Sequence, residues 1–204
     1  TNTALHLPAI AHECGIKFDL FDVAEIFKKT PYVADLKPGG RYVAKDMFEV
    51  GGIPLLMKTL LDNGHLHGDC LTVTGRTIAE NLKSVKWNPH QDVVRSADNP
   101  ITVTGGVVGL KGNLAPDGAV LKPSAATPKL MQHKGRAVVF EDSADLHARI
   151  DDPKLDVKPD DVLVLKNCGP KGYPGFPEVG NFALPAKLLK QGVTDMVRIS
   201  DARM

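Results

Sequence analysis

The first thirty residues place apolar side chains at helical spacing. Residues 2–14 and 17–29 each carry an apolar side with polar positions between, which predicts two helices. Gly15 stands where the first helix is expected to stop. Asp22 is the candidate N-cap of the second. The chain therefore opens with a helical pattern.

Residues 46–64 predict a further helix that is interrupted in its middle. The Gly51-Gly52 pair breaks the pattern, and Pro54 fits the first turn of a restarted helix that Asn63-Gly64 ends. The apolar side chains of the restarted helix are expected in a core: Leu55, Leu56, Met57, Leu60 and Leu61.

Two short elements are predicted next. Residues 69–74 are typical of a short strand, and residues 75–82 of a short helix. Thr77 and Glu80 have the spacing of a capping box, which favours capping over catalysis for Glu80. His65, His67 and Asp69 alternate and would share one face of a strand, but so short a segment is a weak candidate for a metal site.

The pattern changes after the polar, aperiodic residues 83–100, which we interpret as a domain boundary. Short β-branched runs then alternate with Gly, Pro and Asp, which predicts strands joined by tight turns, as in a barrel or curled sheet. The predicted strands lie in residues 101–114, 118–125, 135–142, 160–167 and 196–200. Helices are expected at 143–150, capped by Ser143, and at 182–191.

Composition narrows the class of protein. The 204 residues are 43% hydrophobic and 24% charged with a formal net charge of +1, which indicates a soluble globular chain. A near-neutral charge without a basic cluster argues against a nucleic-acid partner. No apolar run approaches the roughly 20 residues that span a bilayer, so no membrane partner is expected. The sparse cysteines Cys14, Cys70 and Cys168 suit the reducing cytoplasm better than a disulfide framework.

Residues 169–181 read GPKGYPGFPEVGN and form neither a helix nor a central strand. They hold one cation, Lys171, and one carboxylate, Glu178, between a strand-like and a helix-like run. A stiff loop between regular elements is a common place to fix one polar side chain, which makes Glu178 the candidate functional group. The alternative interpretation is that residues 169–181 are only a connecting loop that is rich in turn residues.

Six blocks in order resemble the dihydroxy-acid and sugar-acid dehydratase family: TNTALHLPAIA, EVGGIPLLMKTLL, HGDCLTVTGRTIAENL, LKGNLAPDGAVLK, GPKGYPGFPEVGN and VRISDARM. The similarity runs from residue 1 to residue 204. The form GYPGFPEVGN resembles the aldonate branch more than the branched-chain amino-acid enzyme. The resemblance implies that an aldonate, a 2,3-dihydroxy acid, is dehydrated to a 2-keto-3-deoxy acid. The alternatives are the dihydroxy-acid dehydratase of branched-chain amino-acid biosynthesis and a non-catalytic module that binds a small acid or a partner.

The resemblance also implies cofactors and site residues. The family uses an iron–sulfur cluster and Mg²⁺, and Glu178 matches a magnesium ligand. Lys171, Asn181, Thr1 and Asn2 match positions near the substrate. The base serine is expected just after Met204 and the cluster cysteines upstream, so that this segment alone is expected to be inactive and to be part of a longer chain.

For the fold, the resemblance implies an α/β chain. Residues 1–92 would be the tail of an α/β N-terminal domain, and residues 93–204 an incomplete β-barrel-like swivelling C-terminal domain. A sugar-acid substrate would bind between them. Relatives form homodimers or homotetramers, so self-association is expected.

Overall fold

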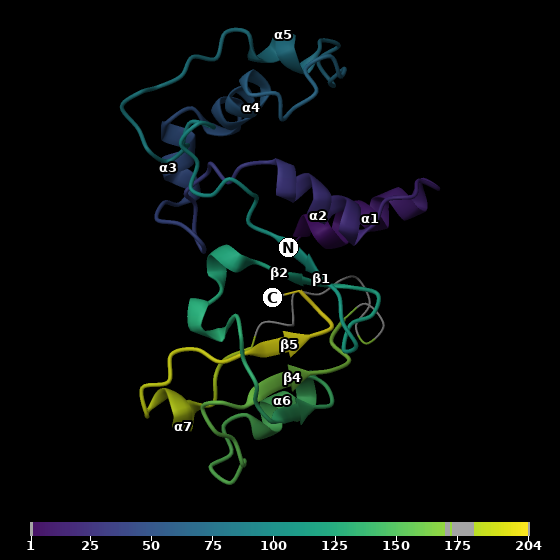
Figure 1. Cartoon of the computed structure of the whole chain (residues 1–204), viewed down its shortest axis with the longest axis vertical. Helices are drawn as coiled ribbons and strands as arrows, with labels where there is room; N and C mark the ends of the chain where they lie inside the picture. The colour runs from purple at the N-terminus through teal and green to yellow at the C-terminus, as the bar shows by residue number, and fades with distance from the viewer. Residues whose placement is uncertain (1, 170–171, 173–181, 204) are drawn as a thin grey trace. The chain divides into compact units, whose positions relative to one another are not determined.

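The protein is described by a computed structural model that covers residues 2–169, 172 and 182–203 (Figure 1). The chain divides into two compact units, one of residues 3–125 and one that comprises residues 126–203 together with Asn2. Each unit combines helices with a small sheet, so the mixed helix and sheet composition predicted from the sequence is confirmed. None of the described helices is long and apolar enough to cross a membrane.

The helices of the first unit begin with α1 (Asn2–Glu13) and α2 (Leu20–Lys29), both as predicted. The predicted cap of α2 was wrong by one turn. Asp19 is the N-cap, and its Oδ1 accepts from the N–H of Phe21 at 2.7 Å. Asp22 completes the capping box by accepting from the Asp19 N–H at 2.8 Å. Asp22 thus lies inside the helix, where its charge favours the helix N-terminus.

The glycine pair separates α3 (Ala44–Glu49) from α4 (Gly52–Asp62) as predicted. Gly51 has φ 131° and Gly52 φ 65°, values that side chains with a Cβ rarely adopt. The core beside them consists of Met47, Leu55, Val93 and Val94. Leu55 is the predicted core residue that is fully buried; the other four on α4 are only half-buried.

Residues 69–74 do not form the predicted strand. They make a single bridge, Leu71 to Thr77, because the side chains of Thr72, Thr74 and Asn81 bond to one another and hold the segment as a turn. The predicted helix follows as α5 (Ile78–Leu82). Its capping box is confirmed, with Glu80 accepting from the Thr77 N–H at 2.7 Å.

The first unit also contains an antiparallel hairpin of β1 (Val108–Leu110) and β2 (Ala119–Leu121), followed by the 3₁₀ turn η1 (Pro123–Ala125). The hairpin packs on α2 where its glycines lie. A Cβ on Gly118 would meet the Leu20 side chain at 2.8 Å, and one on Gly109 would meet Ala24 at 3.1 Å. Both strands are much shorter than the β-branched runs that predicted them.

The second unit is built on a parallel sheet of β3 (Ala137–Phe140), β4 (Val162–Leu165) and β5 (Arg198–Ser200) in the order β3-β4-β5. The connections contain α6 (Ser143–Arg149) and α7 (Ala186–Leu189), and η2 (Pro128–Leu130) precedes the sheet. The prediction of tight turns was wrong here, because parallel strands require crossover connections. The described residues form no closed barrel, and the barrel-like swivelling domain stays a prediction.

Alternate residues of β3 and β4 enter the core of this unit. Phe140 and Leu163 have no exposed surface, and Leu165 is 1% exposed. The remaining buried members include Val138, Leu146, Ile150, Val157, Cys168, Phe182, Leu184, Leu188 and Met196.

Two helix boundaries in the second unit differ from those predicted. Asp142, not Ser143, caps α6, because its Oδ1 accepts from the Asp145 N–H at 2.8 Å. The helix expected over 182–191 is confined to α7, since Pro185 is extended with ψ 128° and marks the start.

Candidate functional site

The candidate site lies at the carboxyl edge of the parallel sheet. Parallel strands end at one edge, so the residues that follow β4 and β5 come together there (Figure 1). In open parallel sheets, ligands bind outside the carboxyl ends of the strands. Gly169, the first residue of the family-like block GPKGYPGFPEVGN, follows β4 by four residues and lies at this edge beside Asp201, and the block VRISDARM contains β5.

Cys168 and Asp201 join the two strand ends. Asp201 Oδ1 accepts from the Cys168 backbone N–H at 3.0 Å and from the thiol at 3.3 Å. Gly169 lies directly against this pair, since a Cβ at position 169 would be 2.2 Å from the Asp201 carbonyl oxygen. Only glycine therefore allows this close approach.

Burial sets the protonation state of this thiol. Cys168 has no exposed surface. Its burial, with a smaller contribution from the hydrogen bond to Asp201, raises the pKa of the thiol to about 11. The sulfur therefore keeps its proton at neutral pH and donates it to the carboxylate, as expected of a structural thiol rather than a nucleophile.

Phe182, which follows residues 170–181 in the sequence, is held by a residue of β5. Arg198 Nη1 donates to the Phe182 carbonyl at 2.8 Å, and Arg198 Nη2 lies 3.6 Å from Asp195 Oδ1. Asp195 in turn accepts from the Thr127 hydroxyl. The guanidinium is thus oriented by an acid that is itself fixed.

The turn that follows β4 is shaped by Asn167 and two glycines. Asn167 has φ 53°, and its amide donates to the Glu141 carbonyl at 2.9 Å. The Gly172 N–H donates to the Gly169 carbonyl at 3.0 Å, and a Cβ on Gly172 would be 1.9 Å from the Asn167 carbonyl oxygen. Gly172 therefore lies close against both Gly169 and Asn167.

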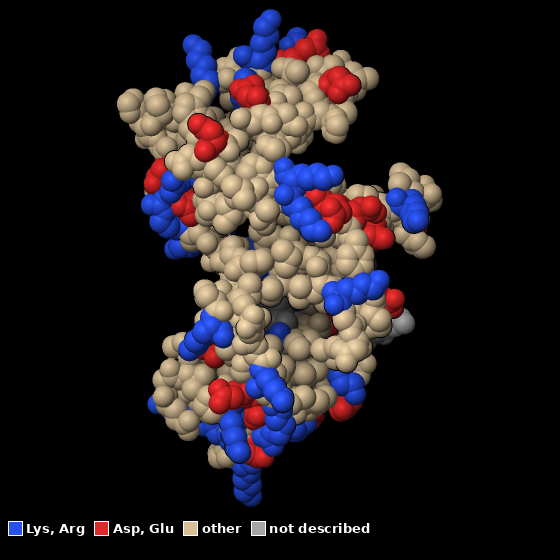
Figure 2. All heavy atoms as spheres, in the orientation of Figure 1, with Lys and Arg blue, Asp and Glu red and all other residues tan. Residues whose placement is uncertain are grey.

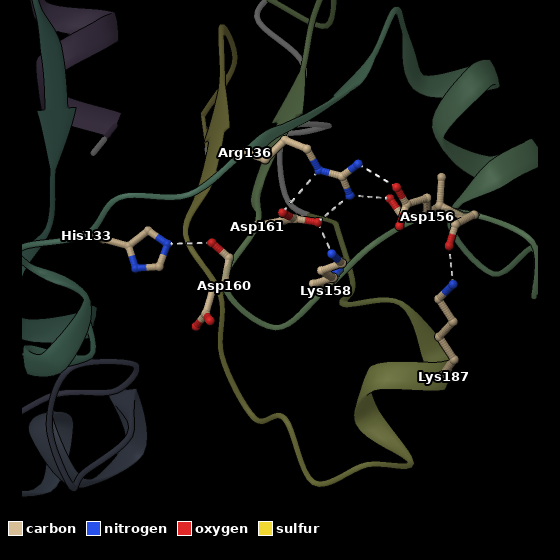
Figure 3. A network of polar contacts seen from close by, with 8 residues as sticks. His133, Arg136, Asp156, Lys158, Asp160, Asp161 and Lys187 are labelled. Atoms are coloured by element: carbon tan, nitrogen blue, oxygen red, sulfur yellow. Dashed lines mark hydrogen bonds and ion pairs between the residues drawn. The ribbon is translucent and has the colours of Figure 1, made fainter.

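The opposite, amino edge of the sheet carries a different polar network (Figure 3). The Arg136 guanidinium lies between Asp161 and Asp156, at 2.8 Å and 2.6 Å from their carboxylates. Asp161 is 5% exposed and also accepts from the Lys158 N–H at 2.8 Å. Arg136 precedes β3 and Asp161 precedes β4, so this network joins the strand starts and is structural.

Most residues predicted to form the site lie outside the described residues: Thr1, Lys171, Glu178 and Asn181. Asn2 is described as the exposed first residue of α1. Their roles remain predictions. Sequence reasoning missed Arg198 and Asp201, although both belong to a family-like block; the signal was a cation and a carboxylate flanking a strand end.

The described part of the chain offers no set of metal ligands by itself. It contains no group of three or more His, Cys, Asp or Glu side chains that could hold an ion, and this includes His65, His67 and Asp69. Cys14 and Cys70 are exposed and Cys168 is buried, all as free thiols. Basic and acidic side chains are interspersed on the visible face of each unit (Figure 2).

Comparison with known proteins identifies the relatives of this chain. The family model for the dihydroxy-acid/6-phosphogluconate dehydratase N-terminal domain matches residues 1–81, and the C-terminal model matches residues 92–204. The chain is 65% identical to dihydroxy-acid dehydratase 2 of Bradyrhizobium diazoefficiens. It is 52% identical to L-arabinonate dehydratase of Rhizobium leguminosarum bv. trifolii and 49% identical to L-arabonate dehydratase of Azospirillum brasilense.

Each alignment covers 100% of this chain but only 34–35% of the relative. The chain thus spans about a third of the length of the curated relatives it matches. The C-terminal model alone covers more than half of the chain, and the N-terminal model precedes it in the order that the resemblance implied. The chain belongs to the dihydroxy-acid/6-phosphogluconate dehydratase family.

Proposed function

We propose that the complete protein is a hydro-lyase that converts a 2,3-dihydroxy acid to a 2-keto-3-deoxy acid. The observation that carries this proposal is the ordered match of both family domains to one continuous chain.

Loss of hydroxide at neutral pH requires a group that takes up its charge, and a bound metal ion or cluster supplies this Lewis acidity. We propose that Glu178 is the carboxylate that this chain offers to Mg²⁺, since a hard cation prefers oxygen ligands. The iron–sulfur ligands are proposed to lie outside this segment. Because no described set of residues fits either group, we assign no catalytic step to them.

The chain's own proposed contributions are binding and positioning. Lys171, Asn181, Thr1 and Asn2 would contact the substrate, and the base that removes the C2 proton would be a serine just after Met204. The cation of Lys171 would stabilise the carboxylate end of the substrate as the C2 proton leaves. The complete protein is proposed to act in the cytoplasm as a homodimer or homotetramer.

For the substrate we propose a sugar acid, with 2,3-dihydroxyisovalerate as the second candidate. The GYPGFPEVGN form favours the sugar acid. The names of the relatives support both, since one set is named for dihydroxy acids and another for L-arabinonate.

The test is to assay the complete protein, with metals reconstituted, on a panel of aldonates and on 2,3-dihydroxyisovalerate. Formation of 2-keto acid from aldonates supports the proposal. Turnover of 2,3-dihydroxyisovalerate alone would replace the sugar acid by the second candidate. A folded, metal-loaded protein that dehydrates neither would overturn the enzymatic proposal and favour a module that binds a small acid or a partner.

A further inference from the structure

Helix α4 carries more apolar side chains than its own core uses. Of its 11 residues, only Lys58, Thr59 and Asp62 have polar side chains. Thr59 is buried and its hydroxyl donates to the Leu55 carbonyl at 2.9 Å, whereas Lys58 and Asp62 form an ion pair with each other. A helix that is apolar on more than one side is normally covered on more than one side.

One stripe of α4 faces the core of the first unit. Its buried residues Gly52, Leu55 and Thr59 follow one another at spacings of three and four, which places them on one side of the helix. Leu55 belongs to the same buried cluster as Met47 of α3. This stripe accounts for the part of α4 that its own unit buries.

Ile53, Met57 and Leu60 form a second stripe, which we call the outer face of α4. They are spaced by four and three residues, and at about 100° per residue they lie on the side of the helix opposite Leu55. Ile53 is 59% exposed, and Met57 and Leu60 are half-buried. The outer face thus has the spacing and the composition of a core stripe without the burial.

The neighbouring helix also leaves a large apolar side chain in solvent. α3 and α4 lie side by side in the first unit (Figure 1), and Phe48 of α3 is 80% exposed. Large apolar side chains that are exposed together on regular elements mark a surface that contacts other protein. Because the outer face is wholly apolar, it is typical of a permanent contact rather than a transient one.

The comparisons favour one occupant for this face. α4 lies within residues 1–81, which match the model of the N-terminal family domain. The chain covers only 34–35% of the relatives that it matches, so most of the length of each relative lies outside the match. Further polypeptide of the same domain would supply the permanent apolar contact that α4 lacks here.

We propose that Ile53, Met57 and Leu60 form a core face, which the rest of the N-terminal domain of the same polypeptide covers in the complete protein. A second copy of the chain and a separate protein are the other possible occupants, and the experiment distinguishes them. The inference uses membership of the family and does not depend on the proposed reaction.

The first measurement uses the complete protein without any substitution. Dilute hydrogen peroxide oxidises accessible methionines to the sulfoxide, and mass spectrometry of peptides follows each methionine separately. Met47 is 4% exposed and Met131 is 50% exposed, so they serve as the buried and the exposed reference. We expect Met57 to oxidise as slowly as Met47, and at least about 10-fold more slowly than Met131.

The second measurement places a thiol on the outer face. Ile53→Cys is compared with Lys45→Cys, the matched control on α3, where the native side chain is 81% exposed. We expect iodoacetamide to label position 53 at least about 10-fold more slowly than position 45, because alkylation requires access to the thiol. Unfolding in urea should make the two rates equal. Both measurements are repeated over a wide range of protein concentrations, with the mass of the particle followed by light scattering.

Slow reaction at both positions 53 and 57, at every protein concentration, supports the proposal. Fast reaction at either position in the purified protein would overturn it, since the face would then be open or left to a separate protein. Protection that is lost on dilution, together with dissociation into monomers, would assign the face to a second copy and would overturn it too. If Ile53→Cys does not fold, the comparison of Met57 with Met47 and Met131 decides alone. A complete protein that dehydrates no acid would overturn the proposed function and leave this test unchanged.

Discussion

The Asp201 carboxylate accepts two hydrogen bonds from Cys168, one from the backbone N–H at 3.0 Å and one from the thiol at 3.3 Å. This contact joins the end of β4 to the end of β5. It explains why a cysteine and a glycine follow β4 where an aspartate follows β5: a buried thiol, a missing Cβ and a shared acceptor let the two chain segments approach.

The thiol of Cys168 should resist modification. Because its pKa is raised to about 11 and it has no exposed surface, we expect it to react with iodoacetamide far more slowly than the exposed Cys14 and Cys70. Mass spectrometry of peptides after timed alkylation of the folded protein checks this. Unfolding in urea should abolish the difference. Equal labelling of all three in the folded protein would contradict the burial described.

Asp142 should matter more than Ser143 for α6. The Asp142 side chain caps the helix, so Asp142→Ala is expected to lower the free energy of unfolding by about 1 kcal/mol. The buried Ser143 hydroxyl has no partner among the described residues, so Ser143→Ala should be neutral or stabilising. Urea unfolding of the two variants compares them. A greater loss of unfolding free energy in Ser143→Ala than in Asp142→Ala would show that Ser143 caps α6.

Acidic pH should lower the stability of the folded protein by protonating Asp161 at the amino edge of the sheet. The Arg136 guanidinium, with help from the Lys158 N–H, holds the pKa of the Asp161 carboxyl below its ordinary value despite burial. Because the folded pKa lies below the unfolded one, the unfolded chain binds the proton first as the pH falls. The stabilisation is therefore complete above the unfolded pKa of about 3.9 and is lost as the pH falls through the folded pKa.

Urea unfolding between neutral pH and pH 3 measures this loss. Asp161→Asn should flatten the acid side of the stability profile and lower stability at neutral pH. Asp160→Asn is the control, because Asp160 is exposed and gives the network only its backbone carbonyl, which accepts from His133 (Figure 3). Identical profiles for Asp161→Asn and Asp160→Asn would contradict the role of the ion pair.

Local sequence signals predicted the helices well. The Gly51-Gly52 break and the Thr77–Glu80 capping box depend on a few neighbouring residues, and both are found. The caps of α2 and α6 were misplaced because two acids, or an acid and a serine, stand within one turn, and the sequence alone does not say which of them takes the N-cap position.

Strand pairing and contacts between distant residues were harder to predict from the sequence. The β-branched runs around Val138 and Leu163 predicted strands, but their composition does not distinguish parallel from antiparallel pairing. The hydrogen bonds of Arg198 and Asp201 join residues 16 and 33 positions apart, so the charges at the ends of this strand mark the two residues but not their partners. Family resemblance pointed to Glu178, whereas only the fold shows that Asp201 and Arg198 hold Cys168 and Phe182.

The most direct test of the account is Mg²⁺ binding and turnover by the complete protein with Glu178→Gln, measured beside the unchanged protein at equal thermal stability. The substitution keeps the size of the side chain and removes its charge. Loss of a supporting residue alone costs about 10–100-fold, so loss of a direct ligand should lower both Mg²⁺ affinity and turnover by at least about 100-fold. Unaltered metal affinity and turnover in the folded variant would contradict the assignment of Glu178 as a metal ligand.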